Sequence, residues 1–213
     1  TDKAFALISP DSDWAFYIQA DEVVHEQDYP AIREACKKYK DDKRVEGLLF
    51  KYHHFYGTYE YVGDSRKWYS HEVRIIRKDR SISAYKDAQS FRKGSKKLQV
   101  KPVNAHIYHY GWVKSPEQMI KKLRETLRYW YTDETLAQSV PAEEYFDYTQ
   151  YDSIKMFQGT HPSVMHNRVT NTHWDTKLDP SKKRFSFSKK LLYAIEKLTG
   201  KRLFEFRNYR ILR

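Results

Sequence analysis

The chain has 213 residues, a length that fits one large domain or one domain with an extension. Its aromatic content of 16% argues against intrinsic disorder, and no apolar run approaches the roughly 18 residues that a transmembrane helix needs. The single cysteine, Cys36, excludes an internal disulfide framework and a cysteine-rich zinc site, so a reducing compartment is the simplest fit. The first residues lack the order of a signal peptide, and we expect a cytoplasmic protein.

Charge is distributed unevenly along the chain. The formal net charge is +11, but residues 1–36 carry a net −6 and the remaining residues a net +17. A basic body of this kind attracts phosphate groups, whether they belong to nucleotides, nucleic acids or lipid head groups. Charge alone does not choose among these partners.

Strand and helix patterns alternate through the first half of the chain. The apolar run at residues 14–18 lacks strict alternation, which predicts a buried strand covered on both faces. Apolar residues at helical spacing then predict a helix over residues 30–40. Further strands are expected at residues 45–56, 72–77 and 103–112, a long loop at 57–69, and an exposed loop or hairpin at 90–97.

Two helices are expected in the second half. Ser115 can cap the first, Pro116 fits its first position, and Gln118 completes a capping box. The apolar stripe of this helix is Met119, Leu123, Leu127 and Trp130. The second covers about residues 188–198 and ends at Gly200. Its leucines either pack inward on the domain or lie on anionic lipid, and we favour inward packing of Leu191, Leu192, Ile195 and Leu198.

These patterns predict an α/β fold with a mixed sheet and a helical C-terminal extension. We place the sheet domain at residues 1–131 and the irregular and helical extension at residues 132–213. No internal repeat or low-complexity tract interrupts either part.

The first candidate for chemistry is the acidic turn after the strand at residues 14–18. Asp21 and Glu22 lie there, and ligands of open α/β sheets bind outside the carboxyl ends of strands. Two carboxylates could hold a divalent cation, which prefers oxygen ligands. The alternative is a solvated turn, since acidic residues are common in turns.

Other candidates are weaker when each is taken alone. Asp87 is a candidate general base or a surface ion pair with its neighbour Lys86. His106 and His109 lie three residues apart, so on a strand they point to opposite faces, and they cannot share one metal without a bend. His53 and His54, as neighbours on a strand, face apart in the same way.

The loop at residues 63–69 has the composition of a carbohydrate site. Such sites combine aromatic faces with polar side chains, here Asp64, Arg66 and Trp68. The alternative is an ordinary loop that Trp68 and Tyr69 anchor in the core.

Three of these segments, taken in order, resemble family 2 glycosyltransferases with the GT-A fold. They are residues 14–26 with the strand and acidic motif, residues 72–77 with an arginine-rich strand, and residues 109–117 with a His-Tyr segment before a capped helix. The resemblance covers about residues 1–131. It implies a GT-A-like, Rossmann-like mixed sheet, here partial, of a bacterial enzyme of polysaccharide biosynthesis.

The resemblance implies an inverting transfer of sugar from a nucleotide-sugar donor to a glycan or lipid-linked acceptor, with Mn²⁺ or Mg²⁺ as cofactor. Asp21 matches the metal-binding carboxylate of the family, and His109 matches a histidine that can complete the metal shell. Asp87 matches the catalytic carboxylate. The expected donor- and acceptor-binding residues are Gln19, Glu22, Asp64, Arg66 and Trp68. Gln19 departs from the family, because it replaces the first carboxylate of the motif and cannot contribute charge.

A larger departure concerns the strand–helix–strand unit with which the family begins and which binds the nucleotide base and ribose. We find no counterpart of it in this sequence. We therefore expect these residues to fold but not to turn over a nucleotide sugar alone. The sheet edge left without those strands should be covered by a rearranged segment or by a second copy of the chain, giving a homo-oligomer.

The alternative function is a basic module without catalysis that binds nucleic acid or a membrane surface. A zinc finger, an RNP-type motif and a basic recognition helix are all missing from the sequence, and we expect no nucleic-acid partner. Residues 177–213, however, contain twelve Lys or Arg and three Asp or Glu around an amphipathic helix. This segment could make a peripheral contact with anionic lipid, which would place a bacterial protein at the inner membrane.

Overall fold

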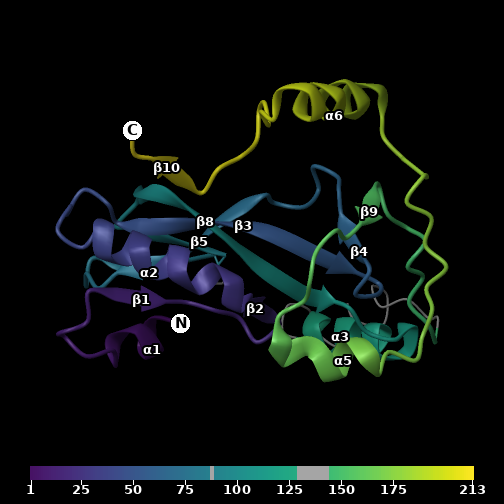
Figure 1. Cartoon of the computed structure of the whole chain (residues 1–213), viewed down its shortest axis with the longest axis horizontal. Coiled ribbons are helices and arrows are strands. Elements are labelled where there is room, and N and C mark those ends of the chain that lie inside the picture. Colours follow the sequence, from purple (N-terminus) through teal and green to yellow (C-terminus); the bar gives the residue numbers. More distant parts are fainter. Residues whose placement is uncertain (87–88, 129–143) are drawn as a thin grey trace. The chain divides into compact units, whose positions relative to one another are not determined.

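The structure is a computed structural model that describes residues 1–86, 89–128 and 144–213 (Figure 1). The chain is a mixed α/β protein that divides into two compact units. Unit 1 contains Thr1–His53, Tyr69–Tyr108 and Ala194–Arg213, and unit 2 contains His54–Trp68 and His109–Tyr193. The boundary predicted between residues 131 and 132 lies outside the described residues.

The helices and strands follow the predicted order, with additional short strands between them. The described helices are α1 (Asp2–Ala6), α2 (Tyr29–Lys38), α3 (Pro116–Leu127), α5 (His166–Thr170), α6 (Phe187–Thr199) and the 3₁₀ turns η1 (Glu26–Asp28) and η2 (Ser163–Met165). The described strands are β1 (Trp14–Phe16), β2 (Glu22–Val24), β3 (Gly47–Tyr56), β4 (Tyr61–Gly63), β5 (His71–Arg77), β6 (Ile82–Tyr85), β7 (Ser90–Lys93), β8 (Lys96–Trp112), β9 (Ile154–Met156) and β10 (Tyr209–Ile211). Sequence patterns missed β2, β4, β6, β9 and β10, each of four residues or fewer, and the five-residue helix α5. The hairpin predicted at residues 90–97 forms between β7 and β8, but β7 is largely buried and β8 begins at Lys96, before its predicted start.

The strands form a mixed sheet with the order β1-β5-β3-β8-β7-β6. Strand β5 pairs antiparallel with both β1 and β3, and β7 pairs antiparallel with β8. The C-terminal strand β10 runs parallel to β8. The mixed sheet of the prediction is confirmed, and its antiparallel pairs show that the early strand–helix–strand alternation does not build a purely parallel sheet.

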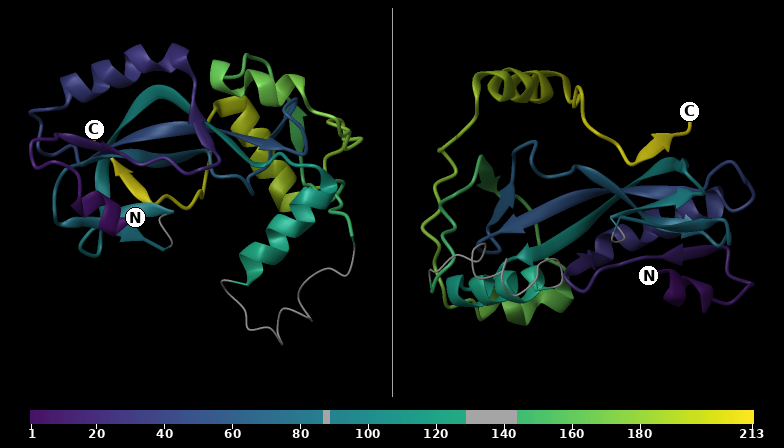
Figure 2. Two further views of the ribbon diagram at one scale, coloured as in Figure 1. Left: turned by 90° about the horizontal axis from the view of Figure 1, so that it is seen from below. Right: turned by 180° about the vertical axis from the view of Figure 1, so that it is seen from behind.

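Each face of the unit 1 sheet packs against a different set of elements. Helix α2 covers one face, where Ile32 and Ala35 join a core formed by β3, β5 and β8. On the other face, α1 packs on a core to which the strands β6, β7 and β10 of the same curled sheet also contribute, with Phe5, Phe91 and Tyr209 in it (Figure 2). The helix predicted at residues 30–40 is therefore confirmed, and so is the packing of its apolar stripe.

The strand predicted at residues 14–18 is shorter and more open than expected. Strand β1 ends at Phe16, and the side chains of Phe16 and Ile18 are 44% and 45% exposed. Because Ala15 is buried on one face while Phe16 is exposed on the other, the prediction of a strand buried on both faces is wrong. Its apolar residues instead pack locally, with the ring of Phe16 stacked on that of Phe50 at 5.5 Å.

A bulge in β5 changes the direction of one side chain. Leu48 pairs with Ile75 and Leu49 with Val73, so Arg74 is an extra residue on its strand. A bulge of this kind interrupts the alternation of side chains between the two faces of a sheet. Arg74 is thereby removed from the apolar sets on either side of it and remains 1% exposed.

Unit 2 has a core made largely of aromatic rings. Tyr56, Tyr148 and Tyr151 are buried there with Met119 and Ile154, and Trp68 and Trp112 pack against them. Helix α3 begins as predicted, because the Ser115 side chain accepts a hydrogen bond from the backbone N–H of Gln118 at 3.3 Å. Trp130, the last residue of its predicted stripe, lies outside the described residues.

Helix α6 contradicts the predicted inward packing in part, because Leu192 and Ile195 are half-buried but Leu191 and Leu198 are exposed. None of its residues, all of which the structure describes, is buried, and the side chains of Leu191 and Leu198 are 57% and 86% exposed. The predicted end is correct, since Gly200 adopts a φ of +67° that suits glycine after a helix. Across the described part of the chain, no helix is both long enough and apolar enough to cross a membrane.

We expect Ser115→Ala to destabilise the protein by about 1 kcal/mol, because the substitution removes the side-chain cap of α3. Urea unfolding measures the loss. Ser83→Ala is the matched control, an exposed residue of β6 for which we expect no change. Equal stability of the two variants would show that the cap does not stabilise α3.

Candidate functional site

The acidic turn after β1 is closed by its own residues. The backbone N–H of Glu22 donates to the carbonyl of Gln19 at 3.0 Å, and the backbone N–H of Gln19 donates to Glu22 Oε2 at 3.1 Å. The side-chain amide of Gln19 donates to the hydroxyl of Tyr17 at 3.4 Å. Asp21 lies inside this closed turn, immediately before the first residue of β2, and is half-buried.

Glu22 forms a buried, bidentate ion pair with Arg74. Arg74 Nε donates to Oε2 at 3.0 Å and Nη2 donates to Oε1 at 2.8 Å, with side chains 1% and 0% exposed respectively. The Tyr52 hydroxyl also donates to Oε1 at 2.8 Å. Parallel hydrogen bonds of this type fix orientation as well as distance.

The groups around Arg74 keep its guanidinium charged. Burial acts to lower the pKa of Arg74, but Tyr52 and the hydrogen bonds and charge of Glu22 outweigh burial and raise it. Burial raises the pKa of Tyr52 far above its ordinary value, so its hydroxyl remains a donor. The guanidinium also lies 5.5 Å and 5.3 Å from the ring centres of Tyr17 and Tyr52, within reach of a cation–π interaction.

This network assigns different roles to the two carboxylates of the turn. Both oxygens of Glu22 accept hydrogen bonds from buried protein groups, so Glu22 is a positioning residue in this structure. Asp21 is adjacent to Glu22 in the chain, so the anchored turn fixes the position of its backbone. A direct donor contact by Gln19 or Glu22 stays a prediction.

Histidines that were singled out in the sequence meet in two pairs. In unit 2, the Nδ1 atoms of His54 and His109 lie 3.1 Å apart, so that one ring donates and the other accepts. His54 is 3% exposed and stacks on Trp68 with the ring centres 5.2 Å apart. His109 and Asp21 belong to different units, and their sharing of a metal stays a prediction.

In unit 1, the rings of His53 and His106 stack in parallel at 4.5 Å. Burial lowers the pKa of His106, which favours a neutral ring in this stack. The two pairs agree with the predicted alternation along β3 and β8, but the sequence did not indicate which histidines would meet.

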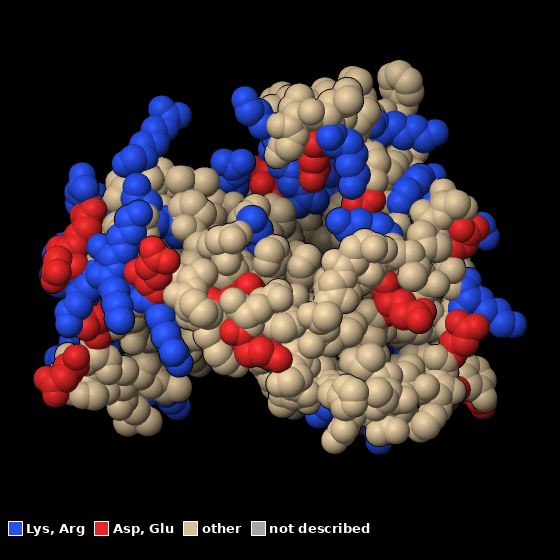
Figure 3. Space-filling model, viewed as in Figure 1, with Lys and Arg blue, Asp and Glu red and all other residues tan. Residues whose placement is uncertain are grey.

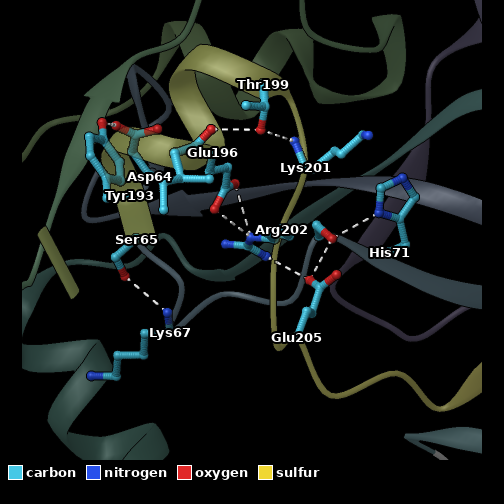
Figure 4. Close-up of polar contacts among 12 residues, drawn as sticks. Asp64, Ser65, Lys67, His71, Tyr193, Glu196, Thr199, Lys201, Arg202 and Glu205 are labelled. Carbon is cyan, nitrogen blue, oxygen red and sulfur yellow. Dashed lines mark hydrogen bonds and ion pairs between the residues drawn. The ribbon is translucent and has the colours of Figure 1, made fainter. Parts of the chain in front are cut away.

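The carboxylate of Asp64 is held by residues far along the chain. It accepts a hydrogen bond from Tyr193 (Figure 4). It also lies 3.5 Å from Lys183 Nζ, with only 9% of the Asp64 side chain exposed. Lys183 also donates to the Ser153 hydroxyl and the Ile154 carbonyl, each at 2.7 Å. In this structure Asp64 therefore ties residues 183–193 to the loop, and its contact with a sugar stays a prediction.

Trp68 packs in the core of unit 2. A Cβ atom added at Gly63 would lie 2.2 Å from the indole nitrogen of Trp68, so the ring packs directly on the backbone there. This agrees with the alternative of a loop anchored in the core. Tyr69 is 40% exposed and contacts Tyr52 edge-on, and Arg66 is half-buried. Sugar binding by Arg66 or Trp68 stays a prediction.

A carboxylate that was not assigned to the site is buried two residues before Arg74. Glu72 is 7% exposed, and its Oε2 has no hydrogen-bond partner among the residues described. Burial raises the pKa of Glu72 to about 7 against the opposing charge of Arg74. Asp87, the predicted catalytic base, lies outside the described residues.

The described residues contain no group of three His, Cys, Asp or Glu side chains that could hold a metal ion. Comparison with known proteins adds no relationship, because no protein-family model, no curated protein and no solved structure matches the chain. A functional assignment therefore depends on the chemistry of the residues themselves.

We expect Arg74→Met to destabilise the protein by about 3–5 kcal/mol, because Glu22 would remain buried without its partner. Chemical denaturation measures the change. Replacing both residues, as Glu22→Gln with Arg74→Met, should recover part of the loss. The control is Arg44→Met, whose exposed pair with Asp42 should leave stability unchanged. A double variant less stable than Arg74→Met would contradict this account.

We expect Glu72 to make stability fall as pH rises. The pKa of Glu72 in the folded state, about 7, lies above its ordinary value of 4.5, so the folded state binds the proton more tightly. The stabilisation is complete below about pH 4.5 and is lost as pH rises through about 7, by up to about 3 kcal/mol. Urea unfolding of Glu72→Gln and of the unchanged protein, measured from about pH 4 to about pH 8, tests this pH dependence.

The difference in stability between the two proteins isolates Glu72 from other titrating groups. His71, whose pKa is lowered by burial, acts in the opposite direction and is present in both. A difference that does not vary with pH would contradict the raised pKa.

Proposed function

We propose that the protein is a metal-dependent inverting glycosyltransferase of the GT-A type, which transfers sugar from a nucleotide-sugar donor to a glycan or lipid-linked acceptor. The observation that carries this proposal is the buried anchoring of the acidic turn. The core holds Glu22 through Arg74 and Tyr52, and this places the neighbouring Asp21 in a closed turn after β1. The mixed α/β sheet is compatible with the resemblance of residues 14–26.

The proposed metal is Mn²⁺ or Mg²⁺, an ion that can share its ligands between the protein and the substrate. Mg²⁺ is commonly bound by one or two carboxylates together with substrate phosphates. Asp21 would supply such a carboxylate, and His109 is the second proposed ligand. When bound, the ion would offset the charge on the departing diphosphate.

The proposed reaction is a single displacement. Asp87 removes the proton of the acceptor hydroxyl as its oxygen attacks the anomeric carbon. The new glycosidic bond forms while the bond to the diphosphate oxygen breaks on the opposite side, so the configuration inverts. Glu22 and Arg74 would take no part in this step. They would position Asp21, because they fix the turn that carries it.

We expect Mn²⁺ together with UDP or GDP to raise the melting temperature of the protein. At about a hundredfold excess over Kd, binding to the folded state alone contributes about 2.7 kcal/mol, or about 5–10 °C for a chain of this size. Asp21→Asn should abolish this rise, because an amide cannot provide the anionic oxygen. The measurement is a thermal unfolding scan with the metal, the nucleotide, or both.

Asp11→Asn is the matched control, since Asp11 is an exposed carboxylate before β1, and it should retain the full rise. A scan with EDTA should remove the rise in both the unchanged protein and the control. A rise that persists in Asp21→Asn would move the metal site elsewhere. No rise with either nucleotide would contradict the proposed donor class for these residues.

A further inference from the structure

Helix α6 carries an apolar stripe that faces solvent. Phe187, Leu191, Ala194 and Leu198 follow one another at intervals of four, three and four residues, which places them on one side of a helix. Phe187 and Leu198 are each 86% exposed and Leu191 is 57% exposed. A surface helix of a globular protein ordinarily buries such a stripe against its own core.

Positive charge borders this stripe. Lys190 and Lys197 each precede a leucine of the stripe, so they lie along one flank of it. Leu192 and Ile195, on other sides of the helix, are half-buried. Figure 3 shows Lys and Arg side chains beside the surface of α6 at the upper edge of the view. The exposed side of the helix is thus apolar at its centre and basic along its margin.

Exposed aromatic rings follow directly after the helix. Phe204 is 92% exposed and Phe206 is 75% exposed. Phe204 has a φ of +56°, an uncommon conformation for a bulky residue that requires support from its surroundings. The ring of Phe206 lies 4.7 Å from the ammonium of Lys97.

Arg202 provides that support. It donates to Glu196 Oε2 at 3.1 Å and to Glu205 Oε1 at 3.0 Å, and its side chain is only 12% exposed (Figure 4). Ser70 also donates to Glu205 at 2.7 Å. Burial acts to raise the pKa of Glu205, but these hydrogen bonds outweigh it and hold the pKa below its ordinary value. The turn that presents Phe204 is therefore fixed on both sides.

A cavity of about 420 Å³ in unit 1 opens beside the same turn. Lys201, Arg202 and Arg207 line it together with the apolar side chains of Leu203 and Ile211. The segment after α6 therefore combines cationic groups with apolar surface, as the exposed side of α6 does.

We infer that α6 and residues 200–207 form a docking surface for an anionic membrane. Phe187, Leu191 and Leu198 would enter the boundary between head groups and acyl chains, with Phe204 and Phe206 beside them in sequence. The lysines and arginines would remain at the level of the lipid phosphates. The helix would lie in the plane of the membrane surface.

Charge favours this occupant over the others. Residues 187–213 contain eight Lys or Arg and two Asp or Glu, so a negative lipid surface attracts them. Two copies of the same face would repel each other. A nucleic acid would use the cations but would leave the apolar stripe exposed. The inference does not depend on glycosyl transfer, because it can be tested without donor or acceptor.

The test is co-sedimentation of the full chain with phosphatidylcholine vesicles, with and without phosphatidylglycerol. We expect binding to the mixed vesicles that weakens as salt increases, and little binding to phosphatidylcholine alone. Leu191→Glu with Leu198→Glu should lower the partition coefficient about tenfold or more, because charge replaces the apolar contact. Both leucines are exposed, so the fold should persist, and circular dichroism checks this.

The matched control is Leu7→Glu with Val164→Glu, which adds the same two charges at apolar residues that are 88% and 72% exposed elsewhere. Equal loss of binding in both double variants would overturn the docking surface, since net charge alone would then explain the effect. A chain that ignores anionic vesicles but forms a dimer lost in the Leu191 and Leu198 variant would assign the stripe to a second copy. Binding to oligonucleotides without binding to vesicles would assign the basic residues to nucleic acid and would also overturn the inference.

Discussion

Arg74 leaves the regular pattern of β5 at a bulge and brings a guanidinium to Glu22, 52 residues earlier in the chain. Strand β5 lies between β1 and β3, so this contact ties the interior of the sheet to the turn that follows its end strand. The desolvation of two charges opposes their attraction, and such a pair persists only where further hydrogen bonds satisfy its atoms. Tyr52 and the backbone N–H of Gln19 provide those bonds here.

Arg77, three residues later on β5, anchors the chain just after the C-terminal end of α2. Its guanidinium donates to the carbonyls of Tyr39, Lys40 and Val45 at 2.9–3.0 Å and lies 4.3 Å from the ring of Trp14. Carbonyl groups at the end of a helix need partners, and Arg77 supplies them where α2 turns back toward β3. Arg74 thus anchors the turn after β1, and Arg77 anchors the connection after α2. These structural roles account for two arginines in a buried strand, and no ligand is needed to explain them.

Carboxylates and aromatics that looked available for a sugar are largely used by the fold. Asp64 pairs with Lys183 and Tyr193, and Trp68 packs among the rings of unit 2. A core built from aromatic rings suits a chain of low apolar content, because an aromatic ring buries more area than an aliphatic side chain. The polar end of a tyrosine or tryptophan can still form a hydrogen bond. Part of the apolar surface that the core does not use lies on α6 and the turn after it.

Local pattern was sufficient for the elements whose signal lies within a few residues. The helix at residues 30–40, the Ser115 cap, the Gly200 end and the central parts of β3, β5 and β8 follow from side-chain period and capping chemistry. The acidic turn was recognised as a candidate site for the same reason. Its anchoring by Arg74 required the tertiary structure, because a bulge depends on the register between two strands. The partners of Asp64 and the exposure of α6 also required it. An amphipathic period shows that a helix has an apolar side, but only the fold decides whether anything covers it.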